Sequence, residues 1–361
     1  MNTTNKHIVL FCKDFYDYKV LNDYEIDVEF VEKFRKLTSS KILFGGALPF
    51  SRVQPPKWFK NVFDLSIPDW KTYSDISFEE ATDARSQQMI DLYSKKDIPI
   101  AVNWSGGIDS TLILSAIHKN FPDYLKKRVV VVMNNSSYTE NPFFYNNIIS
   151  KNYKVGVVGQ HNYLNNFILH GDPADSYWIQ GNVLQLSTHS DVVNDDVNSN
   201  PENFVNFYKS KGIDDNDIEW YVDFYKKTAS DVGIDIKSTS DFLWWSNFSC
   251  HPNFSTMKYV NKIPFEMMKP ETNFINLYRQ NAEPWYLNDL YQVWSIQSQF
   301  NGVKFDGSIR SYKMEAKKYI YEVDKNEYYR DYKTKQQSLI INTNGMKAYF
   351  KTVIDSEGNV Y

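Results

Sequence analysis

The segment VNWSGGIDST, residues 102–111, holds small and polar residues in an order suited to binding phosphate. Gly106 and Gly107 let the backbone turn sharply and approach an anion closely. Free amide hydrogens at the start of a following helix would point at that anion, and the helix dipole would add attraction. Ser105 and Ser110 can add hydroxyl donors. Residues 105–110 are therefore predicted to hold the phosphates of a nucleotide.

The carboxylate of Asp109, inside the same segment, predicts a metal ion. It would repel phosphate unless a divalent cation such as Mg²⁺ lay between the two. The alternative interpretation is an ordinary glycine turn in which Asp109 or Ser110 caps a helix. A strand before the segment and a helix after it favour the phosphate site. The segment lacks the GK[ST] ending of a Walker A motif and does not match GxGxxG, so neither a kinase-like P-loop nor a dinucleotide site is predicted.

Alternating strands and helices must position this segment. The apolar run at residues 98–103 predicts a buried strand, and residues 109–120 predict a helix with one apolar face. Further strands are predicted at residues 128–133, 153–158 and 167–170, with helix in 142–151. We therefore expect an α/β fold with a doubly wound, mainly parallel sheet, whose ligands bind beyond the carboxyl ends of the strands. Asn103 and Met133, at two such ends, are expected near the adenine.

The flanking regions differ in pattern from this core. Residues 1–90, which hold a strand candidate at 7–12 and a proline-rich stretch, predict a small α+β domain of unknown role. Residues 91–345 form the predicted ATP-binding domain. Past about residue 182 the pattern is helical and predicts a helical C-terminal lobe packed on the sheet, with helices at 219–227, 285–300 and 311–323. A further helix is expected at 78–93, before the first buried strand. Residues 346–361 predict a closing β-hairpin.

Composition narrows the classes of function. The 361 residues favour about two domains, and the net charge of −4 offers no general attraction for nucleic acid. Cys12 and Cys250 make neither a disulfide framework nor a four-ligand zinc site. No stretch approaches the roughly 20 apolar residues of a membrane span, and no cleavable leader is recognised, so we expect a cytoplasmic protein without a membrane partner.

The sequence SGGIDS at residues 105–110 resembles the PP-loop of the N-type ATP pyrophosphatases, which include asparagine synthetase, β-lactam synthetase, GMP synthetase, NAD synthetase and the tRNA-thiolating enzymes. The resemblance implies an adenine nucleotide alpha-hydrolase-like fold with ATP and Mg²⁺. It also implies cleavage between the α and β phosphates, with adenylation of a substrate and release of pyrophosphate.

A second segment, HGDPADSYWIQG at residues 170–181, resembles the SGxGxDExFGG loop of asparagine synthetases. By this resemblance Gly171 joins the nucleotide site, Asp172 replaces a catalytic glutamate near the reaction centre, and Asp175 is a metal ligand or organises the loop. A proline replaces a glycine and a serine replaces the second acidic residue, which implies a different geometry or substrate. A bare turn explains the short pattern equally well.

The late segment RDYKTKQQSL, residues 330–339, resembles the R-x-K-x-x-F segment of the same family. The family's lysine contacts the pyrophosphate and the developing tetrahedral centre, a task suited to a compact positive charge. The resemblance points first to Lys335 and second to Lys333 as the catalytic lysine. A solvated basic helix end is the alternative interpretation.

Together these residues predict an AMP-forming C–N ligase that adenylates a carboxylate and passes the acyl group to ammonia or an amine. Asn2 stands where glutamine-dependent asparagine synthetases carry a catalytic cysteine, so we expect no glutaminase activity. A separate glutaminase could supply the ammonia. Two alternatives remain: a PP-loop enzyme that modifies a nucleotide or nucleic-acid base, and a non-catalytic ATP-binding scaffold.

Overall fold

The computed structural model describes residues 6–9, 51–54, 64–157, 165–178, 202–210, 212–260, 280–300, 312–333 and 352–355. The chain divides into two compact units. The first, here called the helix-rich unit, contains Met1–Ile67, Asp175–Ile275 and Gln337–Tyr361. The second, the sheet unit, contains Pro68–Ala174 and Asn276–Gln336. The domain boundaries expected at residues 90 and 345 stay predictions.

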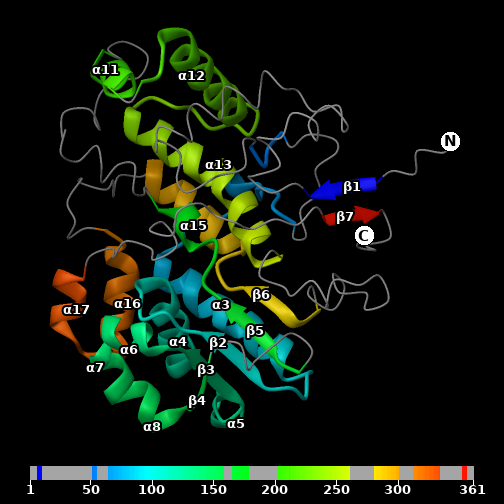
Figure 1. Cartoon of the computed structure of the whole chain (residues 1–361), viewed down its shortest axis with the longest axis vertical. Helices are drawn as coiled ribbons and strands as arrows, with labels where there is room; N and C mark the ends of the chain where they lie inside the picture. The colour runs from blue at the N-terminus through cyan, green and yellow to red at the C-terminus, as the bar shows by residue number, and fades with distance from the viewer. Residues whose placement is uncertain are drawn as a thin grey trace. The chain divides into compact units, whose positions relative to one another are not determined.

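The sheet unit is built on five parallel strands (Figure 1). Their order is β4-β3-β2-β5-β6, so the first strand of this sheet along the chain lies at its centre. The strands are β2 (Ile100–Asn103), β3 (Val129–Met133), β4 (Lys154–Val157), β5 (Phe167–His170) and β6 (Ala282–Pro284). The expectation of an α/β fold with a parallel sheet is therefore confirmed. Ligands of such sheets bind beyond the carboxyl ends of the strands where the order reverses, here between β2 and β5.

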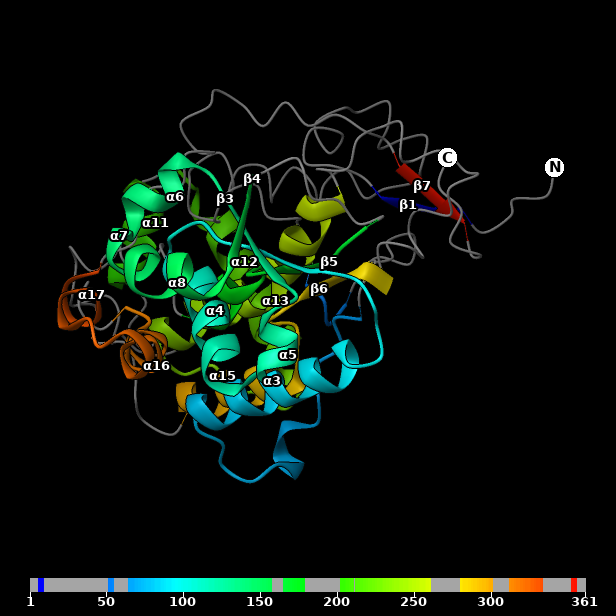
Figure 2. The ribbon, with the colours of Figure 1, turned by 90° about the horizontal axis from the view of Figure 1, so that it is seen from below.

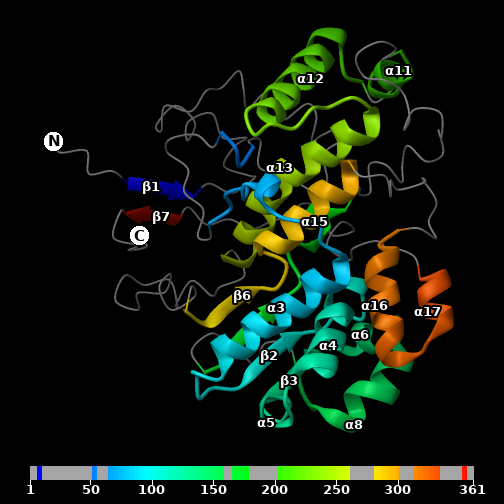
Figure 3. The same ribbon diagram turned by 180° about the vertical axis from the view of Figure 1, so that it is seen from behind.

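The central strand β2 is covered on both of its faces. Ile100, Ala101 and Val102 are completely buried, and successive side chains of a strand point to opposite faces. Helices flank the sheet, and Figure 3 shows α3 (Phe78–Tyr93) and α4 (Ile108–Asn120) alongside β2 and β3. The helix predicted at residues 78–93 and the strand predicted at 167–170 have these bounds in the structure.

The short edge strand β6 was not predicted; the expected helix at 285–300 begins only at Asp289. Pro284 is tolerated because an edge strand does not need every amide as a donor. The buried side chain of Arg85 on α3 holds this edge strand in place. Its guanidinium donates hydrogen bonds to the carbonyl oxygens of Trp285, at 2.8 Å, and Pro284, at 3.0 Å, and pairs with Glu283 at 2.6 Å.

The remaining helical elements of the sheet unit are mostly short. They are η3 (Trp70–Thr72), α5 (Asp123–Lys126), α6 (Asn135–Glu140), α7 (Pro142–Phe144), the π-helical η4 (Tyr145–Ile149), α8 (Ser150–Asn152), α15 (Asp289–Phe300), α16 (Met314–Asp324) and α17 (Glu327–Tyr332). The helices predicted at 142–151 and 311–323 correspond to α7–α8 and α16. A 3-10 turn, η5 (Ala174–Tyr177), spans the boundary between the units.

The helix-rich unit packs aromatic side chains between three helices, α11 (Glu202–Ser210), α12 (Asp215–Ser230) and α13 (Thr239–Val260). Tyr221, Tyr225 and Phe242 form a buried cluster of contacting rings, and Tyr208 joins it through Tyr221. The helix predicted at 219–227 lies within α12. None of the helices in the described part of the chain has the length and apolar character needed to cross a membrane.

The same unit holds a two-stranded antiparallel sheet of β1 (Lys6–Val9) and β7 (Thr352–Asp355) (Figure 2). The strand expected at 7–12 is thus present as far as the described residues reach. The described partner of β7 is β1, and the second arm of the expected C-terminal hairpin lies outside the described residues.

Candidate functional site

The predicted phosphate loop, residues 105–110, lies where a ligand of a parallel sheet is expected. It follows the carboxyl end of β2 and leads directly into α4, whose first residue is Ile108. Gly107 is the N-cap of that helix, and Asp109 lies in its first turn. The strand–loop–helix arrangement predicted from the sequence is confirmed, and it aims the first amides of α4 at the space beyond the sheet.

Hydroxyl groups tie the two ends of the loop together. The Ser110 Oγ accepts a hydrogen bond from the Ser105 amide at 3.0 Å and lies 3.1 Å from the Ser105 Oγ. The same hydroxyl lies 3.2 Å from the Gly107 carbonyl oxygen, to which it can donate. The two serines predicted to bind phosphate therefore lie side by side, and they also stabilise the turn.

Gly106 is required by its backbone and by its neighbours. Its φ of +84° lies in the left-handed region that favours glycine. A Cβ at this position would lie less than 3.0 Å from both the Ser137 carbonyl oxygen and the Glu140 Cβ. The close approach predicted for these glycines is real, but at Gly106 the close neighbour is helix α6.

Asp109 forms an ion pair with Lys313, 204 residues away in the sequence. The lysine side chain is 1% exposed and the aspartate side chain 30%. Lys313 is the N-cap of α16 and has a φ of +50°, an unusual conformation for a residue with a side chain. Sequence reasoning missed Lys313; its only signal was its place at the start of a lysine-rich stretch.

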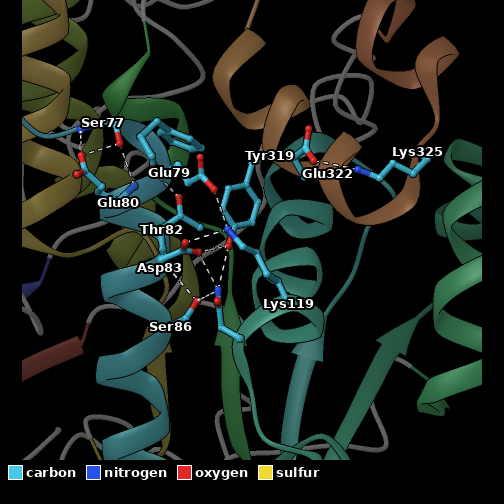
Figure 4. Close-up of polar contacts among 12 residues, drawn as sticks. Ser77, Glu79, Glu80, Thr82, Asp83, Ser86, Lys119, Tyr319, Glu322 and Lys325 are labelled. Carbon is cyan, nitrogen blue, oxygen red and sulfur yellow. Dashed lines mark hydrogen bonds and ion pairs between the residues drawn. The ribbon is translucent and has the colours of Figure 1, made fainter.

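A polar cluster fixes α16, the helix that Lys313 caps, on α3 and α4. Figure 4 shows Asp83, Lys119 and Tyr319 of this cluster. The Tyr319 hydroxyl of α16 donates to Asp83 of α3 and accepts from the Asn120 amide of α4 at 3.0 Å. Lys119 pairs with Asp83 at 2.9 Å. Hydrogen bonds and the ion pair with Lys119 hold the pKa of Asp83 below its usual value despite partial burial. The cluster therefore stays charged at neutral pH and anchors the helix that carries Lys313.

A second ion pair lies beside the loop, close to Gly107. The Lys333 Nζ lies 2.8 Å from Oε1 of Glu140, and the two side chains are 10% and 19% exposed. Lys333 is thus placed close to the loop, through a glutamate that sequence reasoning missed. Lys335, the first choice from the sequence, lies outside the described residues.

The second predicted loop begins at the end of β5, the neighbour of β2 in the sheet. A Cβ on Gly171 would lie 3.4 Å from the Cβ of Asp109, so this loop meets the phosphate loop there. Asp172 follows directly, before a cis peptide bond to Pro173. Asp175 belongs to the helix-rich unit, where its carbonyl oxygen accepts a hydrogen bond from Asn247 at 2.7 Å.

Asn103 and Met133, predicted to lie near adenine, end adjacent strands at the same edge of the sheet. Asn103 is exposed and Met133 is buried. The amide of Asn103 can form hydrogen bonds with the edge of a flat base. The apolar side chain of Met133 can pack against its face.

Asp109 is the residue that would hold a metal ion. Mg²⁺ is commonly bound by one or two carboxylates together with substrate phosphates and water, so a single partly exposed aspartate beside a phosphate loop fits that ion. Among the described residues, no group of three or more His, Cys, Asp or Glu side chains is gathered for metal binding.

The chain has no match among protein-family models, curated proteins or solved structures.

Proposed function

We propose that the sheet unit binds ATP through residues 105–110 and cleaves it between the α and β phosphates to adenylate a carboxylate. The observation that carries this proposal is the loop itself. A glycine turn leads into a helix at the carboxyl end of the central strand, with Asp109 and the buried Lys313 beside it. The strand order is compatible with an adenine nucleotide alpha-hydrolase-like fold.

Each residue has a distinct task in the proposed reaction. The loop amides, Ser105 and Ser110 bind the phosphates, and Asp109 would hold Mg²⁺, which neutralises phosphate charge when bound. Catalysis of phosphoryl chemistry depends mainly on positioning and on electrostatic stabilisation. Lys313 adds a fixed positive charge next to the loop, a task that the sequence assigned to Lys335.

The acyl-adenylate would then react with ammonia or an amine to form an amide. Asp172 follows the point where the second loop touches Asp109, which suits a proton acceptor for the attacking amine. The nitrogen source would be ammonia, an amine, or ammonia from a separate glutaminase.

The test is to incubate the protein with ATP, Mg²⁺ and panels of acids and amines, and to separate AMP from ADP. AMP with pyrophosphate is expected. ADP would contradict the proposed cleavage position. Tight ATP binding without turnover would favour a non-catalytic scaffold, an alternative supported by the departures in the second loop.

The Asp109→Ala variant should lose AMP formation. It also removes the carboxylate that pairs with the buried Lys313, so a loss of stability is expected and urea unfolding must show that the variant is still folded under the assay conditions. Asp123→Ala is the matched control, since that side chain is 91% exposed on α5. Pyrophosphate release at the wild-type rate by Asp109→Ala would disprove the proposed metal role.

A further inference from the structure

We propose that Glu140 and Lys333 are positioning residues of the nucleotide site. Their ion pair, together with the Tyr329 hydroxyl, clamps the turn at Gly106 and Gly107 between α6 and α17 in the shape that binds phosphate. This inference rests on the proposed function of the loop, and it gives Lys333 a role different from the catalytic one expected from the sequence.

Helix α6 forms one side of the clamp. A Cβ on Gly106 would collide with the Ser137 carbonyl oxygen and the Glu140 Cβ, so the turn lies directly on the last residues of this helix. A Cβ on Gly107 would lie 3.4 Å from the Glu140 Oε1. The same carboxylate oxygen that receives Lys333 therefore lies against the second glycine of the turn.

Helix α17 forms the other side. The buried Tyr329 hydroxyl donates to the Gly106 carbonyl oxygen at 3.3 Å, and Lys333 follows four residues later. Residues four apart lie on one face of a helix, so both groups are presented together. Burial raises the pKa of Tyr329 well above its ordinary value, which keeps its hydroxyl protonated and able to donate.

Lys333 is itself contacted by a second lysine, which lies on helix α16. The completely buried Lys317 of α16 places its Nζ 3.5 Å from the Lys333 carbonyl oxygen, at the end of α17. A positive charge at a helix C-terminus is favourable. Lys317 thus contacts the backbone of Lys333, and the side chain of Lys333 in turn pairs with Glu140.

A positioning pair has a recognisable mutational signature. Removing either partner leaves the other mostly buried and the turn unsupported, whereas removing both should cost no more than the worse single change. Glu140→Gln retains an oxygen that can accept from Lys333. It should therefore preserve the site if the pair acts on the loop, and it should fail if the carboxylate charge acts on the ligand.

The experiment measures ATP affinity with Mg²⁺ by calorimetry and AMP formation for Glu140→Ala, Lys333→Met, the double variant and Glu140→Gln. Each truncation should weaken ATP binding or turnover about 5- to 100-fold, with strong non-additivity in the double variant. Glu140→Gln should stay within about twofold of the wild type. Additive losses, wild-type behaviour of both truncations, or a Glu140→Gln defect as large as that of Glu140→Ala would overturn the proposal.

Glu322 of α16 and Lys325, the residue that follows this helix, provide the matched control. They form an exposed ion pair at 2.9 Å. Their truncations should leave ATP affinity unchanged. If the truncations at Glu140 and Lys333 do not fold, Tyr329→Phe tests the clamp: weaker ATP binding is expected, and unchanged binding would overturn it. Should the wild type bind ATP without forming AMP, the proposed chemistry fails while the affinity measurements still test the clamp.

Discussion

Lys313 is the most unusual residue of the site, because a buried lysine in a left-handed conformation carries two energetic costs. Strained backbone positions cost on the order of 1–3 kcal/mol and persist where the surroundings demand them. The strained backbone of Lys313 carries the side chain that pairs with Asp109, beside the phosphate loop.

We therefore expect Lys313→Met to reduce AMP formation about a hundredfold, because loss of one charge contact in a transition state costs on the order of 3 kcal/mol. The measurement is the turnover rate together with ATP affinity, and the rate should fall more than the affinity. Lys325→Met, at an exposed position on a neighbouring loop, is the control. Turnover by Lys313→Met at the control rate would remove this lysine from the mechanism.

Asp324, the last residue of α16, makes a prediction about pH. Burial raises its pKa from 3.8 to about 6, although one oxygen accepts the Asn326 amide at 2.9 Å. A carboxyl whose pKa is higher in the folded protein favours folding in its protonated form. The resulting stabilisation is present below the unfolded pKa, near pH 4, and is lost as the pH rises through about 6.

Asp324→Asn should remove this pH dependence, which amounts to roughly 2 to 3 kcal/mol between pH 4 and pH 7. The free energy of unfolding from urea titrations at several pH values measures it. Asp123→Asn, at the exposed position on α5, should keep the wild-type slope. An unchanged slope in Asp324→Asn would show that the burial of this carboxyl has no effect on stability.

At the scale of elements, the glycine turn of the phosphate loop depends on both conformation and space. Gly106 and Gly212 share almost the same positive φ, +84° and +83°, but of these two, within the described part of the chain, only Gly106 has neighbours close to the missing Cβ. The comparison separates backbone strain from collision with α6.

Gly212→Ala should destabilise the protein by about 1 kcal/mol, the cost of a left-handed alanine. Gly106→Ala carries the same cost and also forces α6 to move, so we expect a loss of about 3 kcal/mol or more, with loss of ATP binding. Urea unfolding and calorimetry measure the two effects. Equal stability of the two variants would mean that α6 moves away from the added Cβ at no measurable cost in free energy.

The elements were more predictable than their contacts. The buried strands and α3 were visible because short apolar runs and helical periodicity are local signals. The strand β6 could not be predicted, because its three residues end in proline and resemble a loop. It is held in place by hydrogen bonds from Arg85, about 200 residues away in the sequence. Lys313 and Glu140 were missed for the same reason: each meets its partner through the tertiary fold.

At the scale of the whole molecule, the phosphate loop, Lys313 and Lys333 all belong to the sheet unit. Hydrogen exchange with ATP and Mg²⁺ should therefore slow over residues 104–111 and 313–333. At 100 times the dissociation constant, binding adds about 2.7 kcal/mol of stability to the bound state. Helices α12 and α13 should show no local protection. Slowing over 174–178 would support the predicted metal role of Asp175, and unchanged exchange over 104–111 would contradict the proposed site.

The two stretches of chain that form the sheet unit are separated by a hundred residues of the other unit, and this has a consequence for synthesis. The glycine turn emerges from the ribosome well before Lys313, Tyr329 and Lys333, the residues that hold or charge it. At about 5 to 20 residues per second, the turn waits roughly 10 to 45 seconds for these partners. The nascent chain can therefore pair β2 with β3 early, yet it becomes able to bind nucleotide only after residue 333 has been translated.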